Sequence, residues 1–318
     1  MSDRKKLLIL CVIAIALAVL MLSLGLNSFI LRYALSRRIP RLAAILLTGC
    51  AIAASTVVFQ TITHNRILTP SIMGLDSLYL FVQTATVFVL GSQSQIMTNA
   101  VLNFVASGGL MIGATLLLFR FLLRGDEGAN LFQLLLVGVI MGTLFSSGAS
   151  FMQMVIDPNE FQAVQNRMFA SFNNVQINVL IPAAVILVLT LIYIFRQAQI
   201  LDVLALGREH AVNLGIPYDR VTAKLLAAVS LLVAASTALV GPVTFLGLLI
   251  ANLAREMLRG YEHRLLLPTA ALMGIIALVG GQLVAEHLFN LSAPISVIIN
   301  FIGGIYFISL LLRARTAD

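Results

Sequence analysis

The sequence predicts an all-α integral membrane protein with about ten transmembrane helices. Of its 318 residues, 60% are hydrophobic and 10% are charged, whereas soluble domains carry roughly 25% charged residues. A lipid bilayer can accept that much apolar surface, because a helix of about 20 apolar residues crosses its hydrocarbon layer. We therefore expect residues 1–318 to form a single transmembrane domain, with no separate soluble domain.

Ten apolar segments follow one another along the chain. They cover residues 7–26, 42–61, 72–90, 96–119, 131–154, 179–195, 221–240, 245–258, 266–283 and 295–312. The first segment is too long for the apolar core of a signal peptide, so we interpret it as a retained helix. Glycine pairs four residues apart, Gly109 with Gly113 and Gly138 with Gly142, predict close helix contacts.

The basic residues predict the orientation in the membrane. If the N-terminus is cytoplasmic and ten spans alternate, 15 of the 20 Lys and Arg residues lie on the cytoplasmic side, as the positive-inside rule requires. Both termini are then cytoplasmic. The remaining five are Arg32, Arg37, Arg38, Arg41 and Arg167, and four of these lie in the expected first outer loop. The net charge of +7 therefore needs no nucleic acid as a partner.

Several kinds of chemistry have no support in the sequence. No phosphate-binding loop of the G-x-x-x-x-G-K-[ST] type occurs, so this chain is not expected to bind ATP by that loop. Asp76 and Glu286 lie near the ends of their spans, whereas a secondary transporter usually carries a deeper carboxylate. Three histidines directly follow glutamates, and neighbouring residues on a helix diverge by roughly 100°. We expect solvated or helix-capping histidines, no metal or cofactor, and no catalytic residue.

The longest polar segment on the cytoplasmic side spans about 196–224 and contains a short predicted helix. Gly207 and Gly215 bracket this helix, and its apolar stripe consists of Leu204, Ala211 and Leu214. A helix of about two turns is not stable alone in water. The segment therefore needs a surface to pack on, which is either a partner protein or its own membrane domain.

Several stretches, in order along nearly the whole chain, resemble the FecCD-type permeases, which are membrane subunits of importers for ferric siderophores, haem and cobalamin. They are Arg38 to Arg41, Asn65 to Gly74, Ala205 to Gly215, Gly241 to Leu248, Leu265 to Pro268 and Pro294 to Arg313. The resemblance implies a permease of the cytoplasmic (inner) membrane, which is not itself an enzyme. It also implies a second permease, an extracytoplasmic substrate-binding protein, and two ATPase subunits that bind ATP and Mg²⁺.

The same resemblance implies three functional regions. A binding protein is expected to dock on Arg37, Arg38 and Arg41, and the alternative for these arginines is contact with lipid phosphate headgroups. The ATPase subunits are expected to grip the coupling segment, made of Leu206, Gly207, Arg208, Ala211, Leu214 and Gly215. A cytoplasmic gate loop is expected at Asn65, Ile67 and Pro70.

The chain departs from the usual family pattern at Asp76, Asn252 and Gly304. These departures resemble one member of the paired, non-identical permeases of ferric-catecholate systems. The expected substrate is therefore a ferric siderophore of catecholate type, and the expected second permease is a different chain. A permease for haem or cobalamin, or a secondary transporter, remains the alternative at this stage.

Overall fold

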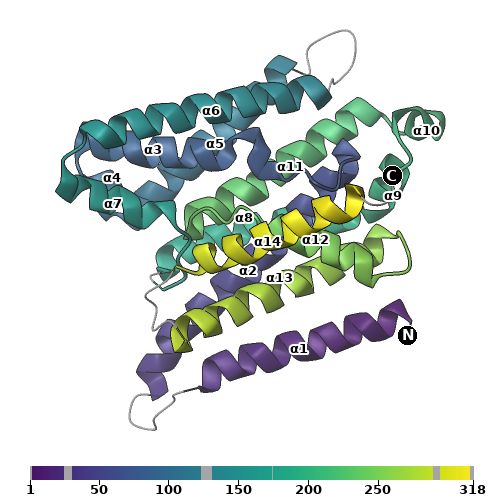
Figure 1. The fold of residues 1–318 in the computed structure, drawn as a ribbon, viewed down its shortest axis with the longest axis horizontal. Coiled ribbons are helices and arrows are strands. Elements are labelled where there is room, and N and C mark those ends of the chain that lie inside the picture. The colour runs from purple at the N-terminus through teal and green to yellow at the C-terminus, as the bar shows by residue number, and fades with distance from the viewer. Residues whose placement is uncertain (1, 25–30, 123–130, 174, 289–293, 316–318) are drawn as a thin grey trace.

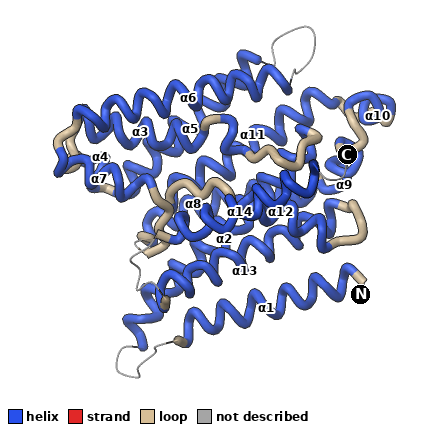
Figure 2. The backbone as a smooth tube through the Cα atoms, in the orientation of Figure 1, coloured by secondary structure: helices blue, strands red, loops and turns tan. Residues whose placement is uncertain are grey.

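The computed structural model describes residues 2–24, 31–122, 131–173, 175–288 and 294–315. These residues form helices and connecting loops, with no strand among them (Figures 1 and 2). The predicted all-α fold class is therefore confirmed. Both ends of the described chain lie at the end of the helix bundle that also carries α9 and α10 (Figure 1).

Each of the ten predicted spans corresponds to a helix. The helices are α1 (Asp3–Ser23), α2 (Leu31–Thr63), α3 (Leu75–Leu90), α5 (Ala100–Leu122), α6 (Leu131–Val155), α8 (Ile177–Arg196), α11 (Tyr218–Val240), α12 (Leu246–Met257), α13 (His263–His287) and α14 (Ile295–Arg315). Within the described residues, seven of these ten helices contain a segment long and apolar enough to cross a membrane. The other three, α3, α12 and α14, present shorter apolar stretches.

Five short helices were not among the predicted spans. They are the 3-10 helix η1 (Pro70–Met73), α4 (Gln95–Thr98), α7 (Pro158–Met168), α9 (Ala198–Leu204) and α10 (Arg208–Asn213). Only α10 was expected, as the helix of the coupling segment. Helix α7 begins at Pro158 because proline suits the first helical position and Asp157 caps the helix by accepting a hydrogen bond from the Asn159 N–H.

The centre of the bundle consists of α2, α11 and α13. Most of α2 and α11 is buried within the chain, whereas only 17% of the apolar window of α1 and of α6 is buried. A Cβ atom added to Gly49 on α2 would lie 3.0 Å from the backbone of Gly274 on α13. Two glycines therefore allow these central helices to cross in backbone contact. The first helix, α1, lies along α13 at the edge of the bundle (Figure 1).

The outer arginines lie on a helix, which corrects the prediction of a loop. Helix α2 has 33 residues and includes Pro40. At roughly 1.5 Å per residue it is about 50 Å long, whereas the hydrocarbon layer is about 30 Å thick. An upright α2 is therefore too long for the hydrocarbon layer, and its N-terminal turns carry Arg37 and Arg38.

One of the two glycine pairs makes the predicted close contact. Cβ atoms on Gly138 and Gly142 of α6 would lie 2.9 Å from Met73 Cα and 3.0 Å from Gly74 Cα. Gly74 itself has a φ of +77°, which favours glycine. The other pair, Gly109 and Gly113, has nothing within 4 Å in the described chain, so that prediction is not met within this chain.

The contact with α6 also corrects the depth expected for Asp76. Gly142 lies about 17 Å from the first residue of α6 at roughly 1.5 Å per residue, which is near the middle of that helix. Because Gly74 packs on Gly142, Asp76 lies deep in the bundle rather than at an interface. Its carboxylate is buried beside the hydroxyl groups of Ser71 and Thr237.

Candidate functional site

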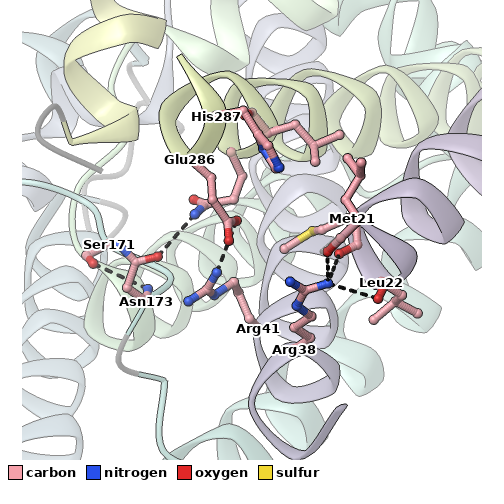
Figure 3. Close-up of polar contacts among 11 residues, drawn as sticks. Met21, Leu22, Arg38, Arg41, Ser171, Asn173, Glu286 and His287 are labelled. Carbon is pink, nitrogen blue, oxygen red and sulfur yellow. Dashed lines mark hydrogen bonds and ion pairs between the residues drawn. The ribbon is translucent and has the colours of Figure 1, made fainter. Parts of the chain in front are cut away.

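Arg38 and Arg41, two of the predicted outer arginines, make contacts within the chain. Arg38 Nη1 donates to the carbonyl oxygens of Met21 and Leu22, at 3.3 and 3.0 Å, and also to that of Leu24 (Figure 3). The last carbonyls of a helix have no partner inside it and carry partial negative charge. Arg38 therefore caps the C-terminal end of α1 and fixes it to α2.

Arg41 connects α2 to the C-terminal end of α13. Its Nη1 lies 3.3 Å from Glu286 Oε2, and both side chains are largely buried (Figure 3). One turn earlier on α13, Gln282 donates to Asn173 Oδ1 at 3.1 Å. Arg37 is exposed. The role of these arginines in docking a binding protein stays a prediction, and the structure adds intramolecular partners for Arg38 and Arg41.

The coupling segment folds as α9 and α10 at the end of the bundle where both chain ends lie (Figure 1). Gly207 and Gly215 flank α10 with φ values of +99° and +81°, conformations that favour glycine. Arg208 pairs with Asp219 at 3.1 Å, and both side chains are exposed. The two glycines thus turn the chain sharply on either side of a short projecting helix.

The apolar surface of this segment differs from the predicted one. Leu206 and Leu214 are 59% and 63% exposed, so they are available to a partner. Ala211 is fully buried within the chain and supports the helix from behind instead of offering a contact. Val212, which the sequence pattern did not single out, is exposed. The projecting apolar surface is therefore Leu206, Val212 and Leu214.

The predicted gate loop is held at its centre by the carbonyl oxygen of Arg66. This oxygen accepts hydrogen bonds from Gln60 at 2.7 Å and from Asn252 at 3.1 Å. Arg255 donates to Gln60 Oε1 at 2.7 Å. Polar side chains of α2 and α12 therefore tie down the loop. The sequence marked Asn252 as a departure from the family pattern, but it did not predict the hydrogen bond to the Arg66 carbonyl oxygen.

The expected loop residues occupy distinct places. Asn65 Oδ1 accepts from the Ile67 N–H at 2.9 Å, which closes a local turn. Ile67 is exposed, and Pro70 is buried as the first residue of η1. The loop thus leaves α2, turns, and re-enters the bundle as η1. Gating by this loop stays a prediction.

A buried histidine ties the coupling segment to two membrane helices. Asp202 Oδ1 on α9 accepts from the His263 backbone N–H at 2.8 Å and from His263 Nδ1 at 2.7 Å. His263 Nε2 lies 2.8 Å from Thr61 Oγ1 on α2. His64, at the end of α2, contacts the Leu204 carbonyl at 3.1 Å. His263 therefore joins α9, α13 and α2, and the prediction of a solvated or merely capping side chain is wrong for it.

A stripe of hydroxyl groups lies along α6. Its members are Thr143, Ser146, Ser147 and Ser150, whose spacing of three or four residues places them on one helix face. All four residues are exposed in the single chain, and Ser146 donates to Ser77 of α3 at 3.0 Å. A groove of about 640 Å³ runs between this stripe and η1. A helix facing lipid alone has no use for such a stripe, which indicates a partner or a water-filled path.

Comparisons with known proteins agree with this arrangement. The FecCD transport family matches residues 6–313. The petrobactin import system permease protein YclO of Bacillus subtilis (strain 168) is 54% identical over 98% of each chain. A metal-chelate type ABC transporter, solved in an inward-facing conformation, is 26% identical with a TM-score of 0.85, covering 98% of this chain and 99% of that one.

Two further relatives carry the name of one import system. The petrobactin import system permease proteins FatC and FatD of Bacillus anthracis are 36% and 29% identical to this chain. The alignments cover 88% and 87% of this chain, and 78% and 80% of the relatives. Family, relatives and solved structure agree on a multi-pass membrane permease and not an enzyme. The chain belongs to the FecCD transport family.

Proposed function

We propose that this chain is one of two permease subunits through which an ATP-driven importer moves a ferric siderophore across the cytoplasmic membrane. The names of the most similar relatives support a siderophore as the substrate class. The departures at Asp76, Asn252 and Gly304 favour the catecholate type. Permeases for haem and vitamin B12 are more distant relatives, at 28–31% identity, so these substrates are less favoured.

The hydroxyl stripe of α6 carries this proposal. Helix α6 is apolar enough on average to span the bilayer, yet four polar residues are exposed on it near its middle. They are Thr143, Ser146, Ser147 and Ser150. A second permease placed against α6 would enclose the stripe and the adjacent groove between two subunits. Hydroxyl groups can exchange hydrogen bonds with a polar chelate without holding it tightly. The substrate would therefore pass along this stripe.

The second permease is proposed to be a different chain. FatC and FatD carry the name of one import system, and both resemble this chain. Two ATPase subunits, which hold ATP and Mg²⁺, would contact Leu206, Val212 and Leu214 from the cytoplasm. Both termini would lie on that side as well. A substrate-binding protein would dock at the opposite face, with the exposed Arg37 as its first contact.

Uptake of labelled iron tests the proposed function. Cells lacking the gene, and cells complemented with it, receive radioactive iron as a ferric catecholate siderophore, as haem, or as free ferric citrate. The proposal predicts that complementation restores uptake of the catecholate chelate and leaves haem uptake unchanged. Restoration of haem uptake alone, or of none of the three, would contradict it.

A further inference from the structure

A second cavity, of about 610 Å³, lies at the end of the bundle that carries α7, which is the proposed extracytoplasmic side. It is lined by residues of α3, α5, α7, α8, α11, α13 and α14 and of the segment between α7 and α8. Cavities of roughly 300–1,000 Å³ are typical of small-molecule sites. Five amide side chains line it, namely Asn103, Asn166, Asn173, Gln176 and Gln282.

Arg167 is the charged residue of this lining. No carboxylate lies within 4 Å of it among the described residues, in contrast to Arg41, which is paired with Glu286. Its contacts are neutral: Nη1 lies 3.5 Å from Asn103 Oδ1, and the Tyr79 hydroxyl is adjacent. A guanidinium group has five N–H donors, so these contacts leave donors for a further partner.

The acidic groups nearest in sequence are engaged elsewhere. Glu160, two turns before Arg167 on α7, accepts a hydrogen bond from the Ser92 N–H. Asp157 caps the start of α7 through the Asn159 N–H. The cavity therefore holds a positive charge that these acidic groups of α7 do not neutralise. Such a charge, with amide donors around it, suits an anion that presents several oxygen atoms.

We infer that this cavity receives an anionic oxygen face of the ferric chelate on its way to the hydroxyl stripe of α6, and that Arg167 selects for it. The inference rests on the proposed function. A ferric tris-catecholate is an anion, because three catecholates bring more negative charge than ferric iron neutralises. A ferric tris-hydroxamate is neutral, because its ligands just balance the iron. Arg167 would therefore favour the first over the second by charge.

The test compares one anionic and one neutral chelate on the assembled transporter in nanodiscs of zwitterionic lipid. Equilibrium binding and ATP-driven import are measured with radioactive ferric enterobactin, a tris-catecholate, and with ferrichrome, a tris-hydroxamate. Arg167→Gln removes the charge and keeps a side chain that can bond to Asn103. The matched control is Gln165→Glu, which changes the net charge equally at an exposed position of α7 outside the cavity.

Arg167→Gln should weaken binding of the anionic chelate about tenfold or more, since a hydrogen bond to a charged group contributes roughly 1.5–3 kcal/mol. Ferrichrome binding should not change, and Gln165→Glu should stay within about twofold of wild type for both, because exposed charges contribute little. Asn103→Asp is an independent second variant. It places a carboxylate beside Arg167 and should weaken binding of the anionic chelate even if Arg167→Gln folds poorly.

Four results would overturn the inference. One is an equal loss for both chelates in Arg167→Gln, which indicates a structural role. Another is unchanged preference for the anionic chelate in both variants, and a third is binding of neither chelate by wild type. The fourth is loss of the Arg167-dependent binding in nanodiscs of anionic lipid, which assigns the site to a headgroup. If wild type still imports the anionic ferric chelate when one of these four results is obtained, the proposed function stands. If wild type imports no ferric chelate, the function fails as well.

Discussion

The contact between Asp202 and His263 should stabilise the end of the fold that carries α9. Asp202→Ala removes the acceptor of two hydrogen bonds, from the His263 N–H and from its Nδ1. Each buried donor left unsatisfied costs about 1–3 kcal/mol. The His263 side chain is 4% exposed, but that of Asp202 is 34% exposed, so water can reach part of the site. We therefore expect Asp202→Ala to lower the free energy of unfolding by about 2–3 kcal/mol, which is near the lower end of the cost of leaving both donors unsatisfied.

The assay is unfolding of the purified chain in mixed micelles with increasing denaturing detergent. Asp219→Ala is the matched control, because it removes the same type of side chain from the same end of the bundle. Asp219 pairs with Arg208, but the two side chains are 45% and 54% exposed, and such pairs contribute about 0–1 kcal/mol. If Asp202→Ala proves no more destabilising than Asp219→Ala, the structural role assigned to His263 is wrong.

Three further predictions concern sidedness, coupling and the buried carboxylate. Cysteines replacing Asn159 and Arg208 should react with an impermeant maleimide from outside and from the cytoplasm, respectively, and equal labelling on intact cells would refute this orientation. Val212→Arg should leave the chain folded, because Val212 is exposed, but should lower co-purification of the ATPase subunits; normal yield would argue against the proposed contact surface. Asp76→Asn should retain import because it keeps a polar side chain of the same shape beside Ser71 and Thr237, whereas Asp76→Leu puts an apolar side chain there and costs about 1–3 kcal/mol for each hydroxyl left unsatisfied; equal import by both variants would contradict this.

The sequence predicted the spanning helices well because a bilayer imposes their length and apolarity. Ten apolar segments all became helices, and the short eighth span is the 12-residue α12. The predictions failed where the chain departs from a simple crossing. The apolar pattern did not indicate that residues 70–74 re-enter the bundle and pack against Gly138 and Gly142. Asp76 was consequently placed at the wrong depth.

The polar contacts were less predictable than the spans. His263 and Asp202 lie 61 residues apart, and no local pattern pairs them. Arg38 and Arg41 were singled out from the sequence as unusual cations, but their partners on α1 and α13 depend on how the helices pack. Arg167 was noticed only as one outer basic residue. Its position in a cavity, without a carboxylate beside it, follows from the three-dimensional arrangement of the surrounding helices.

Import by the reconstituted transporter tests the central claim most directly. The chain is purified with the subunits that accompany it and placed in proteoliposomes with ATP inside and a ferric catecholate siderophore, with its binding protein, outside. We predict ATP-dependent accumulation of iron, blocked by Ser147→Trp on the α6 stripe and retained in Leu189→Trp on the exposed apolar face of α8. Accumulation without ATP, or unaffected import by Ser147→Trp, would contradict the account.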